Sequence, residues 1–104
     1  MKPGNKLTFN QKCYEILKKV PRGRITTYKA IAKKLDTGAY RAVGNAMNKN
    51  LDIIKIPCHR VINSTGSLGG YSKGLKKKIL LLKKEGVEIK NNKIDLKKFG
   101  WNFS

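Results

Sequence analysis

The chain has 104 residues, of which 24 are Lys or Arg and only 6 are Asp or Glu, so its formal net charge is +18. This length accommodates one domain with a single hydrophobic core, and so strong a positive charge favours a polyanionic partner. The polar start of the chain and the lack of an apolar run of about twenty residues exclude a secretory signal or transmembrane class, so a cytoplasmic protein is expected.

Nucleic acid is the polyanion that this charge favours most, because lysine and arginine side chains displace the counterions condensed on phosphates. A membrane surface is disfavoured, since the sequence shows no basic amphipathic helix and no lipidation signal. Lysine and asparagine are abundant whereas arginine is rare, so an AT-rich coding bias is an alternative source of the charge.

The first predicted helix runs from about Phe9 to Val20. Thr8 is suited to cap its start, and the turn residues Pro21-Arg22-Gly23 end it. Apolar residues recur at helical spacing on one side of this helix: Phe9, Cys13, Ile16, Leu17 and Val20. We therefore predict that the Cys13 thiol lies in the core.

Two further helices follow. Thr26 or Thr27 can cap the second, whose apolar side carries Ile31, Ala32 and Leu35, and the third is expected from about Ala39 to Asn48. Its buried side would carry Ala42, Val43, Ala46 and Met47. Two short helices joined by a tight turn are typical of a helix-turn-helix motif that docks on DNA, but an ordinary helical pair has the same pattern.

The four residues Pro57-Cys58-His59-Arg60 place a thiol beside an imidazole and a guanidinium. Proline biases the residue before it towards an extended conformation, so the run Ile53-Ile54-Lys55-Ile56 is expected to be strand-like and to present the thiol from a rigid turn. Positive neighbours favour the thiolate, which is the reactive form of cysteine. From these residues alone, a buried structural cysteine is an equally valid interpretation.

Metal and disulfide chemistry are not expected. The two cysteines do not form a CxxC pair, and one histidine is too few for a usual structural zinc site. In a reducing compartment a disulfide between Cys13 and Cys58 is also not expected.

The second half of the chain alternates short elements. A brief strand at Val61-Ile62-Asn63 precedes a glycine-rich segment, 64–74, which is either a flexible surface loop or a backbone that approaches a ligand closely. A helix from about Leu75 to Lys84, apolar at Ile79, Leu80 and Leu82, is expected to end at Glu85-Gly86. Asn91-Asn92 predicts a small hairpin, and the aromatic tail, 99–103, is expected to pack back on the domain.

These motifs, in this order, resemble the active-site domain of the O6-alkylguanine-DNA alkyltransferases, also called methylated-DNA protein-cysteine methyltransferases. The resemblance extends from about Thr8 to Val87 and rests on four motifs: Arg41-Ala42-Val43-Gly44, Pro57-Cys58-His59-Arg60-Val61, Gly66-x-x-Gly69-x-Tyr71-Ser72 and Glu85-Gly86. It implies a mainly α fold with a small β hairpin, in the form of a winged-helix-like helix-turn-helix domain of the alkyltransferase C-terminal type. Residues 1–104 are expected to form this one monomeric domain, without the additional amino-terminal domain of many members.

The resemblance implies an irreversible, single-turnover DNA repair reaction in which Cys58 takes the alkyl group from O6 of guanine in double-stranded DNA. His59 would act as the base through a water, Glu85 would orient His59, and Asn50 would brace the turn around the cysteine. Arg60 is expected to be structural. Without the resemblance, the favoured interpretation of His59 is a surface imidazole and that of Glu85 a helix-terminal glutamate. No metal or organic cofactor is implied.

The lesion must rotate out of the duplex before a thiol can reach it. By resemblance, Arg41 is the finger that replaces the extruded base, and Tyr28 crowds the 3' phosphate, although Tyr28 also suits the core of the second helix. The implied DNA-contacting residues, mostly on the recognition helix in the minor groove, are Thr27, Tyr28, Ala39, Tyr40, Arg41, Ala42, Gly44, Asn45 and Asn48. Thr27 stands where the family commonly has serine.

The implied base pocket contains Tyr71, whose hydroxyl would donate to N3 of guanine, and the Ser72 backbone N–H, which would reach O6. Carbonyls of Cys58 and Val61 would accept from the exocyclic amine. The substrate-binding residues implied in this way are Tyr28, Arg41, Met47, Val61, Gly69, Gly70, Tyr71 and Ser72.

Two other functions use parts of the same pattern. A non-catalytic lesion sensor would bind the flipped base without repairing it, but such relatives usually carry tryptophan at the cysteine position, so Cys58 argues against a sensor. A sequence-specific helix-turn-helix regulator would need base-reading side chains and a dimer surface, and the sequence clearly indicates neither.

Overall fold

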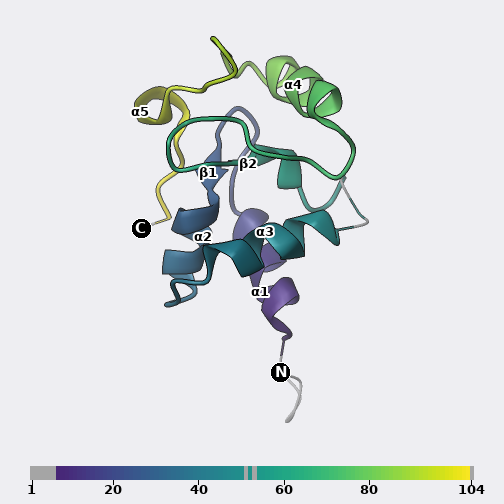
Figure 1. Ribbon diagram of the computed structural model, residues 1–104, viewed down its shortest axis with the longest axis vertical. Helices are drawn as coiled ribbons and strands as arrows, with labels where there is room; N and C mark the ends of the chain where they lie inside the picture. Colours follow the sequence, from purple (N-terminus) through teal and green to yellow (C-terminus); the bar gives the residue numbers. More distant parts are fainter. Residues whose placement is uncertain (1–6, 51, 53, 104) are drawn as a thin grey trace.

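The computed structural model describes residues 7–50, 52 and 54–103. Its elements in chain order are α1 (Phe9–Leu17), β1 (Thr26–Thr27), α2 (Tyr28–Lys34), α3 (Tyr40–Asn48), the 3-10 helix η1 (Cys58–Arg60), β2 (Val61–Ile62), α4 (Leu75–Lys84) and α5 (Leu96–Phe99). Helices α1, α2 and α3 form the lower part of the molecule in Figure 1, and α4 and α5 lie at its upper end. The two strands lie between these parts and have only two residues each. The expected mainly helical class is therefore confirmed.

The first two helices begin at the expected threonines. Thr8 forms a capping box with Gln11, in which the Thr8 Oγ1 accepts from the Gln11 N–H and the Gln11 side chain accepts from the Thr8 N–H. Thr27 rather than Thr26 caps α2, because its side chain accepts from the Ala30 N–H at 3.0 Å. Helix α1 ends at Leu17 rather than Val20, since the chain tightens into turns before Pro21.

Two hydrophobic clusters meet at strand β2. The strand pairs with β1 in parallel, with Thr26 opposite Val61 and Thr27 opposite Ile62. Successive side chains of a strand point to opposite faces, so Val61 enters the lower cluster and Ile62 the upper one. The lower cluster consists of Cys13, Ile16, Leu17, Val20, Ile31, Ala32, Val43, Ala46, Met47, Cys58 and Val61. The upper cluster consists of Ile25, Ile62, Leu68, Leu82, Val87 and Ile94.

The segment before Cys58 is a turn and not the expected strand. The Asp52 carboxylate accepts from the backbone N–H groups of Ile54 and Lys55 at 3.3 and 3.0 Å, and the Asp52 carbonyl accepts from the Ile56 N–H. An aspartate that bonds to the backbone two and three residues onward favours a turn over an extended chain. Ile53, part of the same prediction, lies outside the described residues.

The expected hairpin is reduced to a tight turn. Asn91 and Asn92 have φ of 52° and 58°, as a two-residue hairpin turn requires, but only Lys90 and Lys93 form an antiparallel bridge across it. The second arm instead pairs with the glycine-rich loop, where Lys93 bridges Ser67 and the Ile94 N–H donates to the Gly66 carbonyl. This pairing draws the arm away from its predicted partner.

The end of the chain packs back as expected. The Ile25 N–H donates to the Phe99 carbonyl at 2.9 Å, and the Trp101 N–H donates to the Ile25 carbonyl at 2.8 Å. Phe103 packs against the lower cluster.

Helix α4 departs from the prediction on its apolar side. Leu80, one of the three apolar residues named for this helix, is 64% exposed, whereas Lys78 is completely buried. Lys78 and Leu82 lie four residues apart on the inward side, and Leu80, halfway between them, faces outward. Gly86, with φ of 88°, follows the helix in the left-handed conformation predicted for it.

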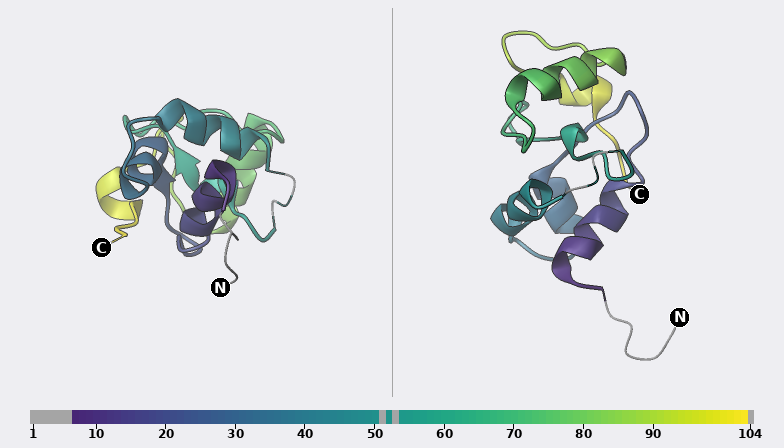
Figure 2. Two further views of the ribbon diagram at one scale, coloured as in Figure 1. Left: turned by 90° about the horizontal axis from the view of Figure 1, so that it is seen from below. Right: turned by 90° about the vertical axis from the view of Figure 1, so that its right-hand side faces the viewer.

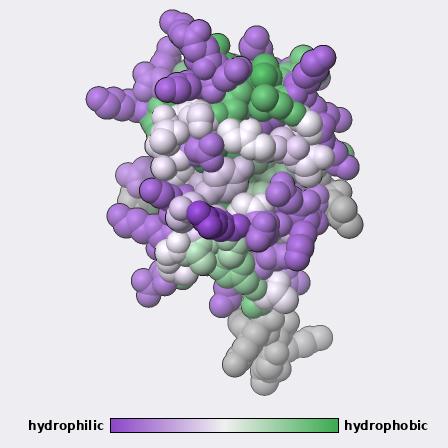
Figure 3. Space-filling view, in the orientation of Figure 1, coloured by the Kyte–Doolittle hydropathy of each residue, from purple (hydrophilic) through white to green (hydrophobic). Residues whose placement is uncertain are grey.

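Hydrophilic side chains cover most of the face drawn in Figure 3, with an apolar area at the upper end. The right-hand view in Figure 2 agrees with Figure 1 in placing α4 at the opposite end of the molecule from α1. Among the described residues, no helix combines the length and the apolar character that crossing a bilayer requires.

Candidate active site

Cys58 is the first residue of the single turn η1, which directly precedes strand β2. The two hydrophobic clusters meet at this strand. Its N–H donates to the Ile56 carbonyl at 2.8 Å, and the Arg60 N–H donates to the Pro57 carbonyl at 3.0 Å. The side chain is 3% exposed and packs in the lower cluster with Met47 and Val61. The rigid turn that was predicted to present the Cys58 thiol is therefore a 3-10 turn that follows Pro57.

Asn50 holds the chain that leads into this turn. It is 3% exposed, and its Nδ2 donates to the Ile56 carbonyl at 2.9 Å while its Oδ1 accepts from the Asp52 N–H at 2.9 Å. A buried amide with a donor and an acceptor both engaged fixes the two ends of a short loop relative to each other. The bracing expected of Asn50 has a direct geometric basis.

His59 and Glu85 meet in the interior. The Nε2 of His59 lies 3.0 Å from the Glu85 Oε2, and the two side chains are 6% and 8% exposed. Glu85 is the C-terminal capping residue of α4, so the helix places this carboxylate beside η1. The expected pair is thus formed by elements 26 residues apart in the chain.

Arg60 shares the same carboxylate. Its Nε donates to the Glu85 Oε1 at 2.9 Å and its Nη2 to the Oε2 at 2.7 Å, while Nη1 donates to the Val20 carbonyl at 2.8 Å. A bidentate guanidinium–carboxylate pair fixes both distance and orientation. Arg60 therefore orients Glu85. The structural role predicted for Arg60 thus takes the form of a direct contact with a predicted catalytic residue.

The electrostatics of this cluster set its protonation. Burial lowers the pKa of His59, and the hydrogen bond to Glu85 only partly opposes this. Burial alone would raise the pKa of Glu85, but hydrogen bonds from Arg60 and His59 outweigh it and hold that pKa below its usual value. At neutral pH, His59 is therefore a neutral imidazole facing a carboxylate.

The carboxylate also selects the tautomer. An ionised carboxylate can only accept hydrogen bonds, so the His59 Nε2 must carry the proton and Nδ1 must present a lone pair. The Nδ1 atom is buried and has no protein hydrogen-bond partner among the described residues. It is thus the nitrogen that can take up a proton.

Tyr71 packs against the lower cluster, which contains the cysteine. Burial, followed by the charge of Cys58, raises the pKa of Tyr71 to about 12. Its ring meets the His59 ring edge-on, with centroids 6.5 Å apart. At neutral pH the Tyr71 hydroxyl is therefore protonated and able to donate.

The loop that carries Tyr71 approaches Tyr28. Gly69 has φ of 69°, and a Cβ built there would come within 3.4 Å of the Tyr28 ring and 3.3 Å of the Asn63 Oδ1. A side chain is disfavoured at Gly69 on both grounds. Gly70 has open space around the equivalent position, and Ser72 is exposed.

The other predicted DNA contacts lie on α2 and α3. Five of these predicted contacts, Ala39, Tyr40, Arg41, Asn45 and Asn48, are exposed, whereas Ala42 and Gly44 are half-buried. A surface pocket of about 280 Å³ joins this side to the glycine-rich loop and is lined by Tyr28, Lys29, Tyr40, Asn63, Ser64 and Thr65. The Lys29 ammonium lies 5.6 Å from the centre of the Tyr40 ring.

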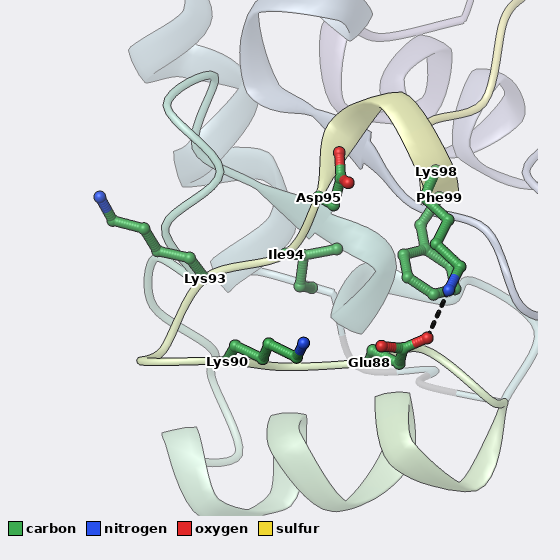
Figure 4. A pocket seen from close by; sticks show the side chains of 7 residues that line it. All are labelled: Glu88, Lys90, Lys93, Ile94, Asp95, Lys98 and Phe99. Carbon is green, nitrogen blue, oxygen red and sulfur yellow. Dashed lines mark hydrogen bonds and ion pairs between the residues drawn. The ribbon is translucent and has the colours of Figure 1, made fainter.

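Two further pockets differ in their relation to Cys58. One of about 500 Å³ reaches His59, Arg60 and Glu85 from outside and is rimmed by Lys18, Lys55 and Lys77. The other, of about 380 Å³, is shown in Figure 4 with the ion pair between Glu88 and Lys98. Its lining comes from residues 88–99 and contains no residue of the predicted site.

One residue near the site escaped the sequence prediction. Lys78 sits in a run of three lysines that looks like an ordinary solvated helix face. Its spacing of four residues to Leu82, which is buried, was the available signal, because residues so spaced share one side of a helix.

Comparisons with known proteins place these features in a family. A profile described as "6-O-methylguanine DNA methyltransferase, DNA binding domain" matches residues 8–87. The chain is 47% identical over 90 residues to a bifunctional methyltransferase/endonuclease of Picrophilus torridus, covering 86% of this chain and 30% of the relative. It is 48% identical over 81 residues to a methylated-DNA–protein-cysteine methyltransferase of Saccharolobus solfataricus, covering 78% and 52%. The chain thus spans about half or less of the length of these curated relatives.

Among solved structures, the fold is similar to that of S. pombe Atl1 in complex with damaged DNA containing O6-carboxymethylguanine. The TM-score is 0.82 at 32% identity, covering 90% of this chain and 94% of the other.

Proposed function

We propose, from the premise that this chain belongs to the 6-O-methylguanine DNA methyltransferase family, that it repairs O6-alkylguanine in double-stranded DNA by a single, irreversible alkyl transfer to Cys58. We propose further that residues 1–104 act as one monomeric domain that carries both the DNA-binding helices and the active site. The observation that supports this most strongly is the buried arrangement of His59, Glu85 and Arg60 beside the cysteine.

The first step is ionisation of the thiol. The His59 Nδ1, whose lone pair is available, accepts the Cys58 proton through a water, and the carboxylate of Glu85 stabilises the resulting imidazolium. Arg60 keeps Glu85 ionised for this task. Because the cluster is buried, its charges act at short range with little screening by water.

The second step is displacement at the alkyl carbon. The Cys58 sulfur forms a bond to that carbon while the carbon–O6 bond breaks, and the electron pair goes to the guanine. Tyr71, protonated at neutral pH, would donate to N3, and the Ser72 N–H would stabilise the charge on O6. The guanine anion then takes up one proton, which balances the proton that Cys58 gave to His59. The products are an intact guanine and S-alkylcysteine, so each molecule reacts once.

Access to the lesion requires nucleotide flipping. Arg41 is exposed near the start of α3, where it can enter the stack, and Tyr28 lies between α3 and the glycine-rich loop. The net charge of +18 supplies phosphate affinity independent of sequence, which suits a protein that must search undamaged DNA.

Mass spectrometry tests the proposal directly. After incubation with a duplex containing one O6-methylguanine, we expect the intact protein to gain one methyl group in place of a proton, with the modification on Cys58. An unmodified duplex is the control and should leave the mass unchanged. An unchanged mass with the damaged duplex would overturn the repair assignment.

A lesion sensor is the second candidate, because the similarity to S. pombe Atl1 covers nearly all of that chain. The same experiment separates the two functions. Tight binding to the damaged duplex without any change in protein mass would favour the sensor.

The role of His59 predicts a specific pH dependence. Since burial puts the His59 pKa below its usual value, His59 is neutral at pH 7 and loses its capacity as a base only as the pH falls through that lowered pKa. We expect the rate of methyl transfer to decrease over this acidic range. His59→Ala should slow transfer at pH 7 by roughly 100-fold and remove this decrease.

Single-turnover rates measured with the methylated duplex test this prediction. A range from about pH 5 to about pH 8 includes the ordinary histidine pKa of about 6.5 and the more acidic values expected for His59. DNA affinity, measured in parallel, should be the same for the variant and the wild type. If both proteins gave the same pH profile, His59 would not be the base.

A further inference from the structure

Lys78 is a charged side chain in the interior. It is 0% exposed and projects from the inward side of α4, next to Leu82. Lysine is almost never fully buried without partners, because removing an ammonium from water is costly. Such a residue therefore needs a specific explanation.

The partners of Lys78 are three backbone carbonyls. Its Nζ donates to the carbonyl of Val61 at 2.7 Å, to that of Leu68 at 2.5 Å and to that of Gly70 at 3.0 Å. An ammonium has three N–H donors, so every donor is used. Burial lowers the pKa of Lys78 to about 8, and at pH 7 the side chain is still mainly an ammonium.

The three carbonyls belong to the two segments that surround the cysteine. Val61 is in strand β2, which follows η1 directly, whereas Leu68 and Gly70 flank Gly69 in the loop that leads to Tyr71. The other described ties of this loop to the segment after Lys90 include the Leu68 N–H to the Asn92 carbonyl at 3.3 Å and the Ile94 N–H to the Gly66 carbonyl at 2.9 Å. Lys78 thus connects the strand, the loop and α4 at one atom.

We propose that Lys78 is a positioning residue of this site, whose ammonium holds the glycine-rich loop, and with it Tyr71, at a fixed distance from Cys58. This inference rests on the proposed function, because the glycine-rich loop is the segment that would cover the extruded base. The Val61 carbonyl keeps a second lone pair, so it can accept from Lys78 and from a bound base together.

The side chain chosen for this task follows from the geometry. Methionine has a similar length but would leave the three carbonyls without their lysine donor, and those of Val61 and Leu68 are buried. Arginine carries a planar fork that does not match three converging acceptors. A purely apolar residue at position 78 would pack against Leu82 and leave the loop free to move.

Hydrogen exchange tests the hold on the loop without any guanine chemistry. We expect Lys78→Met to reduce the protection of backbone amides in residues 66–72 by roughly 10- to 100-fold, the factor that corresponds to one unsatisfied buried acceptor. Amides of α1 and α3 should keep their protection. Lys76→Met, at an exposed position of the same helix, is the matched control and should behave as the wild type.

Kinetics then separate positioning from general stability. At a temperature where the variant is fully folded, Lys78→Met should lower the transfer rate at saturating methylated duplex by about 10-fold or more, while the dissociation constant for that duplex stays within about 2-fold. Wild-type loop protection together with a wild-type rate in a folded Lys78→Met protein would overturn the proposal. If the wild type itself transfers no methyl group, the proposed function fails, and hydrogen exchange alone decides whether Lys78 holds the loop.

A measurement on the wild type covers the case in which the variant does not fold. A buried ammonium bonded to three carbonyls exchanges its protons slowly, so a ¹⁵N-edited spectrum at pH 7 should show one persistent lysine ammonium signal. Exposed lysines lose theirs by exchange with water. Absence of a persistent signal would contradict the arrangement on which the proposal depends.

Discussion

Cys58→Ala is expected to abolish methyl transfer completely while the protein still binds DNA. No other described cysteine can substitute, because Cys13 is 0% exposed within the lower cluster. The positive charge and the residues of α3 that we predict to contact DNA are unchanged by the substitution. Mass spectrometry after incubation with the methylated duplex, combined with a binding measurement on the same duplex, checks both parts of the expectation.

Cys13→Ala is the matched control for this experiment. It removes the other buried thiol from the same cluster, and we expect it to keep the full methyl gain at a cost of about 1 kcal/mol in the free energy of unfolding. Equal loss of transfer and DNA binding in Cys58→Ala would show that Cys58 acts mainly through the fold. Loss of transfer in Cys13→Ala, with transfer retained in Cys58→Ala, would identify Cys13 rather than Cys58 as the alkyl acceptor.

The parts of the fold that the sequence predicts are those governed by local chemistry. Thr8 and Thr27 begin helices because a hydroxyl at that place satisfies a free N–H, and Gly86 ends α4 because its φ is positive. The recurrence of apolar residues in α1 likewise reflects its own periodicity. Such features need no knowledge of the rest of the chain.

The parts that could not be predicted depend on partners distant in the sequence. Residues 54–56 form a turn because Asp52 bonds to their backbone, which competes with the extended bias of the residue before Pro57. The second arm of the hairpin pairs with Ser67 in the loop instead of completing its ladder with the first arm. Both outcomes are choices among several locally reasonable structures.

The candidate site divides in the same way. Cys58 and His59 are adjacent, and their residue types alone indicate thiol chemistry, whereas Glu85 was expected at the site only from the family resemblance. The bidentate contact from Arg60 to Glu85 and the buried ammonium of Lys78 arise from the packing of α4 against η1 and β2. A charged residue is stable inside a core only when the folded chain supplies its partners. Because these partners are distant in the sequence, a prediction from local pattern assigns such residues to the surface.

Arg41→Ala is expected to slow repair of a lesion in duplex DNA by roughly 100-fold, because the cost of extruding a nucleotide, a few kcal/mol, is no longer offset by a side chain that fills the gap. The same variant should react with O6-methylguanine in a single-stranded oligonucleotide at nearly the wild-type rate. There the base is already unstacked, so a finger residue contributes little. Single-turnover rates on the two substrates give the comparison.

Lys49→Ala is the control that separates flipping from charge. Lys49 is exposed at the other end of α3 and, like Arg41, carries one positive charge. Removing either charge should weaken DNA binding and reduce its dependence on salt by a similar amount, since both act on phosphates at long range. Only Arg41→Ala should change the ratio of duplex to single-strand rates. A similar decrease on both substrates would instead assign Arg41 to phosphate binding, because a residue that acts only after extrusion begins cannot slow a reaction that needs no extrusion.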